Sequence, residues 1–95
     1  MLKVDYEELA SSAKALETEG NNFEACIGKM EKVVSKLPNI WEADTCDKYV
    51  EEFNDSKKTL KAVRKLIQDM SDQMKKISAN FAKADADMAK QMKSK

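Results

Sequence analysis

The chain has 95 residues, enough for one small domain, and 36% of them are charged while 6% are aromatic. With two Gly and one Pro, this composition favours long solvated helices over a β-sheet or a disordered chain. The absence of His and the presence of only two Cys exclude an imidazole base and a standard tetrahedral zinc site, so no enzyme, cofactor or metal site is expected.

The formal charge sums to zero but is unevenly distributed. Residues 1–56 carry 13 acidic and 6 basic side chains, whereas residues 57–95 carry 4 acidic and 11 basic ones. No apolar run is long enough to cross a bilayer, and no cleaved signal peptide is expected at the N-terminus. Composition alone therefore predicts a cytosolic protein whose two halves attract each other.

A first helix is expected over residues 4–36, because apolar residues recur every seven positions along it. A second row of small or apolar residues follows four positions later. The two rows are Leu2, Leu9, Leu16, Phe23, Met30 and Leu37, and Tyr6, Ala13, Gly20, Ile27 and Val34. Two Asn after Gly20 are typical of a helix end, but the seven-residue pattern continues through them, so one continuous helix is predicted.

A turn is predicted over residues 37–42, which contain the chain's single Pro and single Trp. Pro38 lacks an amide hydrogen and disfavours helical geometry in the residue before it, so the first helix should end there. Asn39 and Glu42 have the spacing of a capping box, which would start the next helix. Trp41 would lie at the tip of a hairpin, either packed over the end of the seam or exposed as an anchor for a partner.

The second helix is expected over residues 43–92, with a longer seam. Its first row recurs every seven positions, and its second row follows three positions later. The rows are Cys46, Phe53, Leu60, Ile67, Met74, Phe81 and Met88, and Tyr49, Ser56, Val63, Met70, Ile77 and Ala84. Cys46 is interpreted as a packing residue of this seam. Cys26 lies too far from it along the hairpin for a disulfide.

The two seams match as an antiparallel hairpin in which the numbers of facing residues add up to 83. In this register Tyr6 faces Ile77, and Leu2 faces Phe81. An acidic stripe of Glu17, Glu24 and Glu31 would flank the seam, with Glu24 near Lys57. The second helix extends beyond the first, which leaves Ala84, Met88 and Met92 with nothing opposite them in their own chain.

A lone hairpin buries only one stripe on each helix, so association is predicted. A second, thinner contact surface would come from Val33, Ile40, Val50 and Leu66. The predicted fold class is all-α: an antiparallel two-helix hairpin that resembles a coiled coil and pairs into a four-helix bundle dimer.

A basic run forms the one candidate for nucleic-acid contact. It consists of Lys57, Lys58, Lys61, Arg64 and Lys65. The run has no interleaved aromatic residues, and the first helix offers a matching acidic stripe. A solvated helix face is therefore favoured, and no nucleic-acid partner is expected.

The order of these features resembles the WXG family, the small early-secreted-antigen-like proteins of bacterial type VII secretion. The turn motif would be Trp41, Glu42 and Ala43, with Ala in place of the family's Gly. Tyr49 and Phe53 look like the aromatic residues that commonly follow this motif. The C-terminal export element would be Phe81 and Asp85, with Phe in place of Tyr. The resemblance covers nearly the whole chain.

The resemblance implies secretion from the cytoplasm by a type VII system, without a cleaved signal peptide. It also implies pairing with a second copy or with a related WXG-type hairpin, and recognition by the secretion ATPase. Two alternatives stay open: an adaptor that binds the N-terminal helical region of a larger secreted toxin, and a cytosolic structural coiled coil. The predicted apolar face of the hairpin or dimer comprises Leu9, Leu16, Phe23, Ile27, Met30, Val34, Tyr49, Phe53, Leu60, Val63, Ile67, Met70, Met74, Ile77 and Met88.

Overall fold

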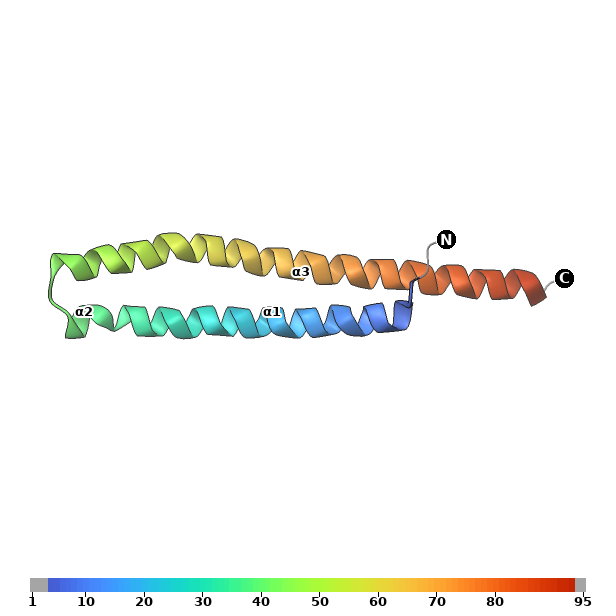
Figure 1. The fold of residues 1–95 in the computed structure, drawn as a ribbon, viewed down its shortest axis with the longest axis horizontal. Coiled ribbons are helices and arrows are strands. Elements are labelled where there is room, and N and C mark those ends of the chain that lie inside the picture. Colours follow the sequence, from blue (N-terminus) through green and yellow to red (C-terminus); the bar gives the residue numbers. More distant parts are fainter. Residues whose placement is uncertain (1–3, 94–95) are drawn as a thin grey trace. The chain divides into compact units, whose positions relative to one another are not determined.

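The computed structural model describes residues 4–93, which form three helices and contain no β-strand. The helices are α1 (Tyr6–Ser35), α2 (Leu37–Ile40) and α3 (Asp44–Lys93). The chain turns back between α2 and α3, so that α1 and α3 are the two arms of a helical hairpin (Figure 1). The predicted antiparallel hairpin is therefore confirmed.

The chain divides into two compact units. Unit 1 combines residues 1–18 with residues 67–95, and unit 2 comprises residues 19–66. Each unit contains a segment of α1 and a segment of α3, and unit 2 also contains α2.

The N-terminus of α1 is capped by the residue before it. Asp5 accepts hydrogen bonds from the amide of Glu8 through its Oδ1, at 3.0 Å, and from the amide of Leu9 through its backbone carbonyl, at 2.9 Å. These bonds satisfy amides that have no partner inside the helix. From Tyr6, α1 runs without interruption through the buried Gly20, as the seven-residue pattern predicted.

The short helix α2 occupies most of the predicted turn. Pro38 lies in its first turn, where its fixed φ suits a helix and no amide hydrogen is needed. The amide of Asn39 donates to the carbonyl of Lys36 at 3.1 Å, so Asn39 lies inside a helical turn. The prediction that Asn39 and Glu42 form a capping box for the next helix is therefore wrong. Trp41 then adopts an extended conformation and ends α2.

The N-terminus of α3 carries negative charge in place of that capping box. The helix begins at Asp44, and the amide of Cys46 donates to the carbonyl of Ala43 at 3.0 Å. Asp44 and Asp47 lie in its first turn. Carboxylates at this position interact favourably with the helix dipole and with unpaired amides.

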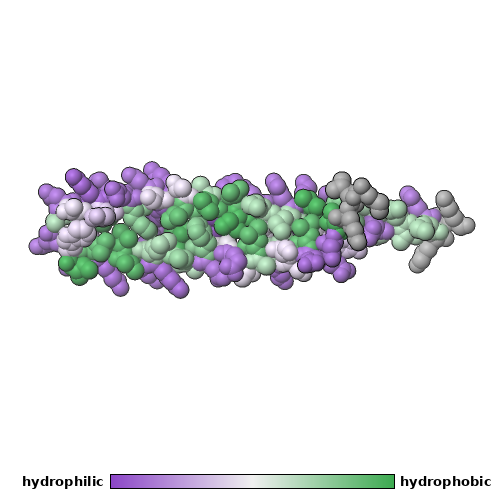
Figure 2. All heavy atoms as spheres, viewed as in Figure 1, coloured by the Kyte–Doolittle hydropathy of each residue, from purple (hydrophilic) through white to green (hydrophobic). Residues whose placement is uncertain are grey.

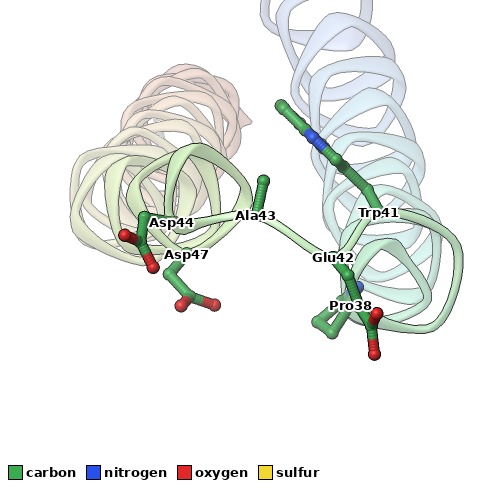
Figure 3. A pocket seen from close by; sticks show the side chains of 6 residues that line it. All are labelled: Pro38, Trp41, Glu42, Ala43, Asp44 and Asp47. Carbon is green, nitrogen blue, oxygen red and sulfur yellow. The ribbon is translucent and has the colours of Figure 1, made fainter.

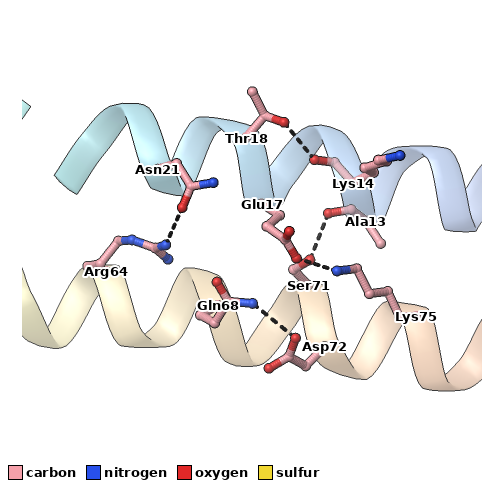
Figure 4. Close-up of polar contacts among 10 residues, drawn as sticks. All are labelled: Ala13, Lys14, Glu17, Thr18, Asn21, Arg64, Gln68, Ser71, Asp72 and Lys75. Atoms are coloured by element: carbon pink, nitrogen blue, oxygen red, sulfur yellow. Dashed lines mark hydrogen bonds and ion pairs between the residues drawn. The ribbon is translucent and has the colours of Figure 1, made fainter. Parts of the chain in front are cut away.

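In unit 1, two buried serines join α3 to the backbone of α1. Ser71 Oγ donates to the carbonyl of Ala13 at 2.7 Å (Figure 4), and Ser78 Oγ donates to the carbonyl of Tyr6. The predicted register placed Ile77 opposite Tyr6, so the observed register differs by one residue. The reason is the small size of the serines and of Ala13, which lets the helices approach until a hydroxyl reaches a carbonyl.

The hydrogen bond between Ser71 and Ala13 should contribute measurably to stability. Ser71→Ala removes the hydrogen bond to Ala13 and should lower the free energy of unfolding by about 1 kcal/mol, as is typical for a buried hydrogen bond. Ser56→Ala is a suitable control, because Ser56 is exposed on the same helix. Chemical denaturation followed by circular dichroism would measure both variants. Equal destabilisation would contradict a specific role for the hydroxyl.

The predicted first row of α3 lies in the interface with α1, whereas the predicted second row does not. First-row residues from Cys46 to Phe81 are buried or half-buried. The row that accompanies them lies four positions on, not three, and consists of Val50, Lys57, Arg64, Ser71 and Ser78. The prediction that Tyr49, Val63, Met70 and Ile77 belong to the hairpin seam is wrong, because these side chains are 55%, 40%, 48% and 44% exposed.

On α1, the predicted apolar residues lie mostly in the interface. Ile27 is buried, and Leu9, Leu16, Phe23 and Val34 are half-buried. Met30 is more exposed than these residues, with 37% of its surface accessible.

Candidate partner-binding surface

Exposed apolar side chains are the main feature of the surface. Among the described residues, the buried apolar residues are Ala13, Ile27 and Cys46. Eleven large apolar side chains in the same part of the chain are at least 37% exposed. Figure 2 shows many apolar residues on the visible face, with charged residues beside them. Contiguous exposed apolar surface of this kind marks interaction sites.

We call Tyr49, Val63, Met70 and Ile77 the outer row of α3. Tyr49 and Val63 belong to unit 2, and Met70 and Ile77 belong to unit 1. The sequence placed these residues in a seam, and the structure leaves them uncovered.

One side of unit 2 is apolar on both helices. A hollow there is lined by Cys26, Lys29, Met30, Val33, Val34 and Phe53. Val33 of α1 is 64% exposed, and Leu66 of α3 is 57% exposed. Of the four residues predicted to supply a second contact surface, Val33, Ile40 and Leu66 are exposed, whereas Val50 lies half-buried in the hairpin interface.

The opposite side of unit 2 is ionic. A second hollow is lined by Glu31, Val34, Ser35, Val50, Phe53, Asn54 and Lys57. Because Val34 and Phe53 line both hollows, the two hollows lie on opposite sides of the helix interface. Lys57 Nζ lies 3.7 Å from Glu31 on this side. Unit 2 therefore presents one apolar and one charged side.

Arg64 continues the ionic contacts between the helices of unit 2. Its Nε lies 3.3 Å from Glu24 Oε2, and its Nη2 donates to Asn21 Oδ1 at 2.8 Å (Figure 4). Glu24 was predicted to lie near Lys57, and its observed partner Arg64 lies seven residues further along α3. The stems of Lys57 and Arg64 pack in the interface while their charged ends reach acidic partners. Lys57 and Arg64 of the basic run therefore form ion pairs between the two helices of the hairpin.

In unit 1, Lys75 and Glu17 form an ion pair between the two helices (Figure 4). The outer-row residues Met70 and Ile77 are exposed on α3. The large apolar side chains of α1 in this unit, Leu9 and Leu16, are half-buried. In unit 1, large exposed apolar side chains therefore come from α3.

The C-terminal part of α3 continues past the start of α1 (Figure 1). All residues from 83 to 92 are exposed, including Met88 at 63% and Met92 at 76%. As predicted, no part of residues 4–93 covers these two methionines. In the expected export element, Phe81 is half-buried and Asp85 is exposed. Leu2, the predicted partner of Phe81, lies outside the described residues.

At the turn, Trp41 is partly packed and partly exposed. Its ring contacts that of Tyr49, with centroids 5.4 Å apart and planes tilted by 39°. Its side chain is still 37% exposed, and the neighbouring Ile40 is 78% exposed. Figure 3 shows the indole pointing away from the carboxylates of Glu42 and Asp47. The turn thus offers an apolar group on one side and acidic groups on the other.

Neither cysteine is bonded to the other, and the two differ in exposure. Cys46 is buried, as expected for a packing residue, and Cys26 is exposed. No group of three or more His, Cys, Asp or Glu within residues 4–93 could hold a metal ion. None of the helices in that range is long and apolar enough to span a membrane.

The comparison with known proteins agrees with this arrangement. The family model described as proteins of 100 residues with WXG matches residues 1–86. The chain belongs to the WXG100 family of small type VII secretion proteins. It is 22% identical over 93 residues to protein YukE of Bacillus subtilis strain 168, covering 98% of this chain and 96% of YukE.

Solved structures share the fold of this WXG100 chain. EsxA of Geobacillus thermodenitrificans, in crystal form I, superposes with a TM-score of 0.84 at 17% identity, covering 94% of this chain and 96% of EsxA. The secreted protein EsxB of Bacillus anthracis strain Sterne superposes with a TM-score of 0.79 at 24% identity, covering 90% and 97%. The helical hairpin is therefore preserved at low sequence identity.

Proposed function

We propose that this WXG100 protein is exported by a type VII system as a dimer of helical hairpins, and that it acts by helix association rather than by catalysis. The exposed apolar surface in each unit carries this proposal. Its own chain leaves the outer row of α3 uncovered, together with Met30 and Val33 of α1. Pairing two hairpins into a four-helix bundle would remove these side chains from water.

A second copy of the chain is the proposed partner. A two-fold dimer uses the same surface on both subunits, so an apolar side on one hairpin is matched by the same apolar side on the other. The ion pairs Lys57–Glu31 and Arg64–Glu24 of unit 2 form within the hairpin and away from this apolar side. The formal net charge is zero, so two copies have no overall repulsion to overcome.

Trp41, Phe81 and Asp85 are proposed to form the surface that the secretion ATPase recognises. Trp41 keeps exposed surface at the turn, and Asp85 is exposed on the part of α3 that lies beyond α1. In dimers of this family, the Trp turn of one subunit lies near the tail of the other. Such a surface would exist in the dimer and be absent from the single subunit.

An export assay tests this assignment. Phe81→Ala and Asp85→Ala should each reduce the secreted protein by about tenfold or more, since both remove a contact at a recognition hot spot. Asp87→Ala is the matched control, because Asp87 is an equally exposed carboxylate two residues further on. Secreted and cellular fractions would be quantified, with circular dichroism to verify folding. Normal export of both variants would contradict the proposed recognition surface.

An adaptor role is the second candidate, and two sequence observations favour it. Ala43 replaces the family's Gly, and Phe81 replaces its Tyr. A chain whose turn motif and export element are both altered would depend for its export on a larger toxin, whose N-terminal helices would cover the apolar side. This role requires that the protein co-purify with such a toxin and that the toxin need it for export. A cytosolic structural coiled coil would instead be retained in the cell and tolerate Trp41→Ala.

A further inference from the structure

The five methionines within residues 4–93 fall into two classes by exposure. Met30 and Met70 lie on the surface proposed to pair, with 37% and 48% of their surface exposed. Met88 and Met92, on the tail of α3, are 63% and 76% exposed. Met74 belongs to the row that packs against α1 and is half-buried. Since oxidation of a thioether depends on its access to oxidant, these residues should differ in reactivity.

We propose that the exposed methionines are oxidation sites that control assembly, and that their conversion to sulfoxides separates the subunits. This inference rests on the proposed dimer. The sites are Met30 and Met70 on the pairing surface and Met88 and Met92 on the tail. The oxidant is a peroxide.

The chemistry is a transfer of one oxygen atom. The thioether sulfur attacks one peroxide oxygen, the O–O bond breaks, and the sulfur is oxidised by two electrons to the sulfoxide. The remaining peroxide oxygen is reduced and leaves as water when the peroxide is hydrogen peroxide. The two epimers of the product are reduced by separate methionine sulfoxide reductases, so the change is reversible.

The physical effect follows from the surroundings of these side chains. A sulfoxide is a strong hydrogen-bond acceptor, which water satisfies in the free subunit. In a dimer the sulfoxides of Met30 and Met70 would be buried among apolar groups. The hollow beside Met30 contains Cys26, Val33, Val34 and Phe53, and Lys29 is its single charged residue. Burying a polar group without a partner is unfavourable, and a two-fold dimer carries every sulfoxide twice.

Peroxide treatment followed by peptide mass spectrometry and sedimentation velocity tests the inference. Met30, Met70, Met88 and Met92 should be oxidised before Met74, and faster in dilute than in concentrated protein. The dissociation constant of the oxidised dimer should rise by about a hundredfold or more. Treatment with both methionine sulfoxide reductases should restore the original value. Dithiothreitol added before sedimentation removes any disulfide formed through the exposed Cys26.

Two sets of variants complete the experiment. A protein carrying Met30→Leu, Met70→Leu, Met88→Leu and Met92→Leu should remain dimeric after peroxide, whereas Met74→Leu should remain sensitive. Unchanged dimerisation of oxidised wild type, or equal loss in the fourfold Leu variant, would overturn the inference and leave the dimer standing. Untreated wild type that is monomeric at every concentration would overturn the proposed dimer and the inference together.

Discussion

Replacing Val63 with Asp should convert the dimer into separate subunits that keep their helices. Val63 is 40% exposed on the outer row of α3, so the substitution adds a solvated carboxylate to the hairpin. In the proposed dimer the same carboxylate would be buried, once on each subunit, and an unpaired buried charge is strongly unfavourable. The dissociation constant should rise by about a thousandfold, which corresponds to about 4 kcal/mol. Sedimentation over a range of concentrations would measure it.

Lys61→Asp is the matched control for this substitution. Lys61 is exposed on α3 four residues after Lys57, which pairs with Glu31 on the ionic side of unit 2. Residues four apart share a helix face, so the new carboxylate should remain in water when two hairpins pair. This variant should dimerise like the wild type. Equal dissociation of both variants would show that added negative charge, rather than the outer row, is responsible.

The helices and the hairpin were predictable because the signals that define them are repeated. Every turn of both arms carries the seven-residue pattern, and a single Pro interrupts it. The short helix α2 was not predictable from the same residues. Pro38 is equally compatible with the end of one helix and the first turn of another, so local sequence could not distinguish the two.

The candidate site was predictable only in part, because the sequence does not fix which row of α3 faces α1. An α-helix has 3.6 residues per turn, so rows three and four positions after the first row are both close to the seam. Hydrophobicity favoured the row of Met70 and Ile77. The structure uses the row of Ser71 and Ser78, whose hydroxyls bond to carbonyls of α1. Small side chains let the helices approach closely enough for these bonds, and the pattern of apolar residues does not reveal this.

This one-residue difference has a functional consequence. Had Tyr49, Val63, Met70 and Ile77 filled the hairpin seam, the subunit would have had little apolar surface left for a partner. Because mostly polar and small residues form the second row of α3 in the seam, these larger apolar residues remain available. The hairpin is thereby held in part by hydrogen bonds and ion pairs, and the outer row of α3 is left to association.

Ile27→Ala should destabilise the subunit more than a similar change on the outer row. Ile27 is 4% exposed in unit 2, so the substitution removes buried methyl groups and leaves a cavity between the helices. The free energy of unfolding should fall by about 2–4 kcal/mol. The substitution should be made in a chain that also carries Val63→Asp, because association then adds nothing to the measured stability. Urea denaturation followed by helical circular dichroism would report the loss.

Ile77→Ala provides the same chemical change at an outer-row position. Ile77 is 44% exposed, so its truncation in the monomeric background should lower the free energy of unfolding by about 1 kcal/mol or less. In an otherwise wild-type chain, the same truncation should weaken the dimer, since each subunit loses apolar area from the pairing surface. Equal destabilisation of the monomer by both truncations would mean that Ile77 packs inside the hairpin. A dimer unaffected by Ile77→Ala would mean that the partner covers a different surface.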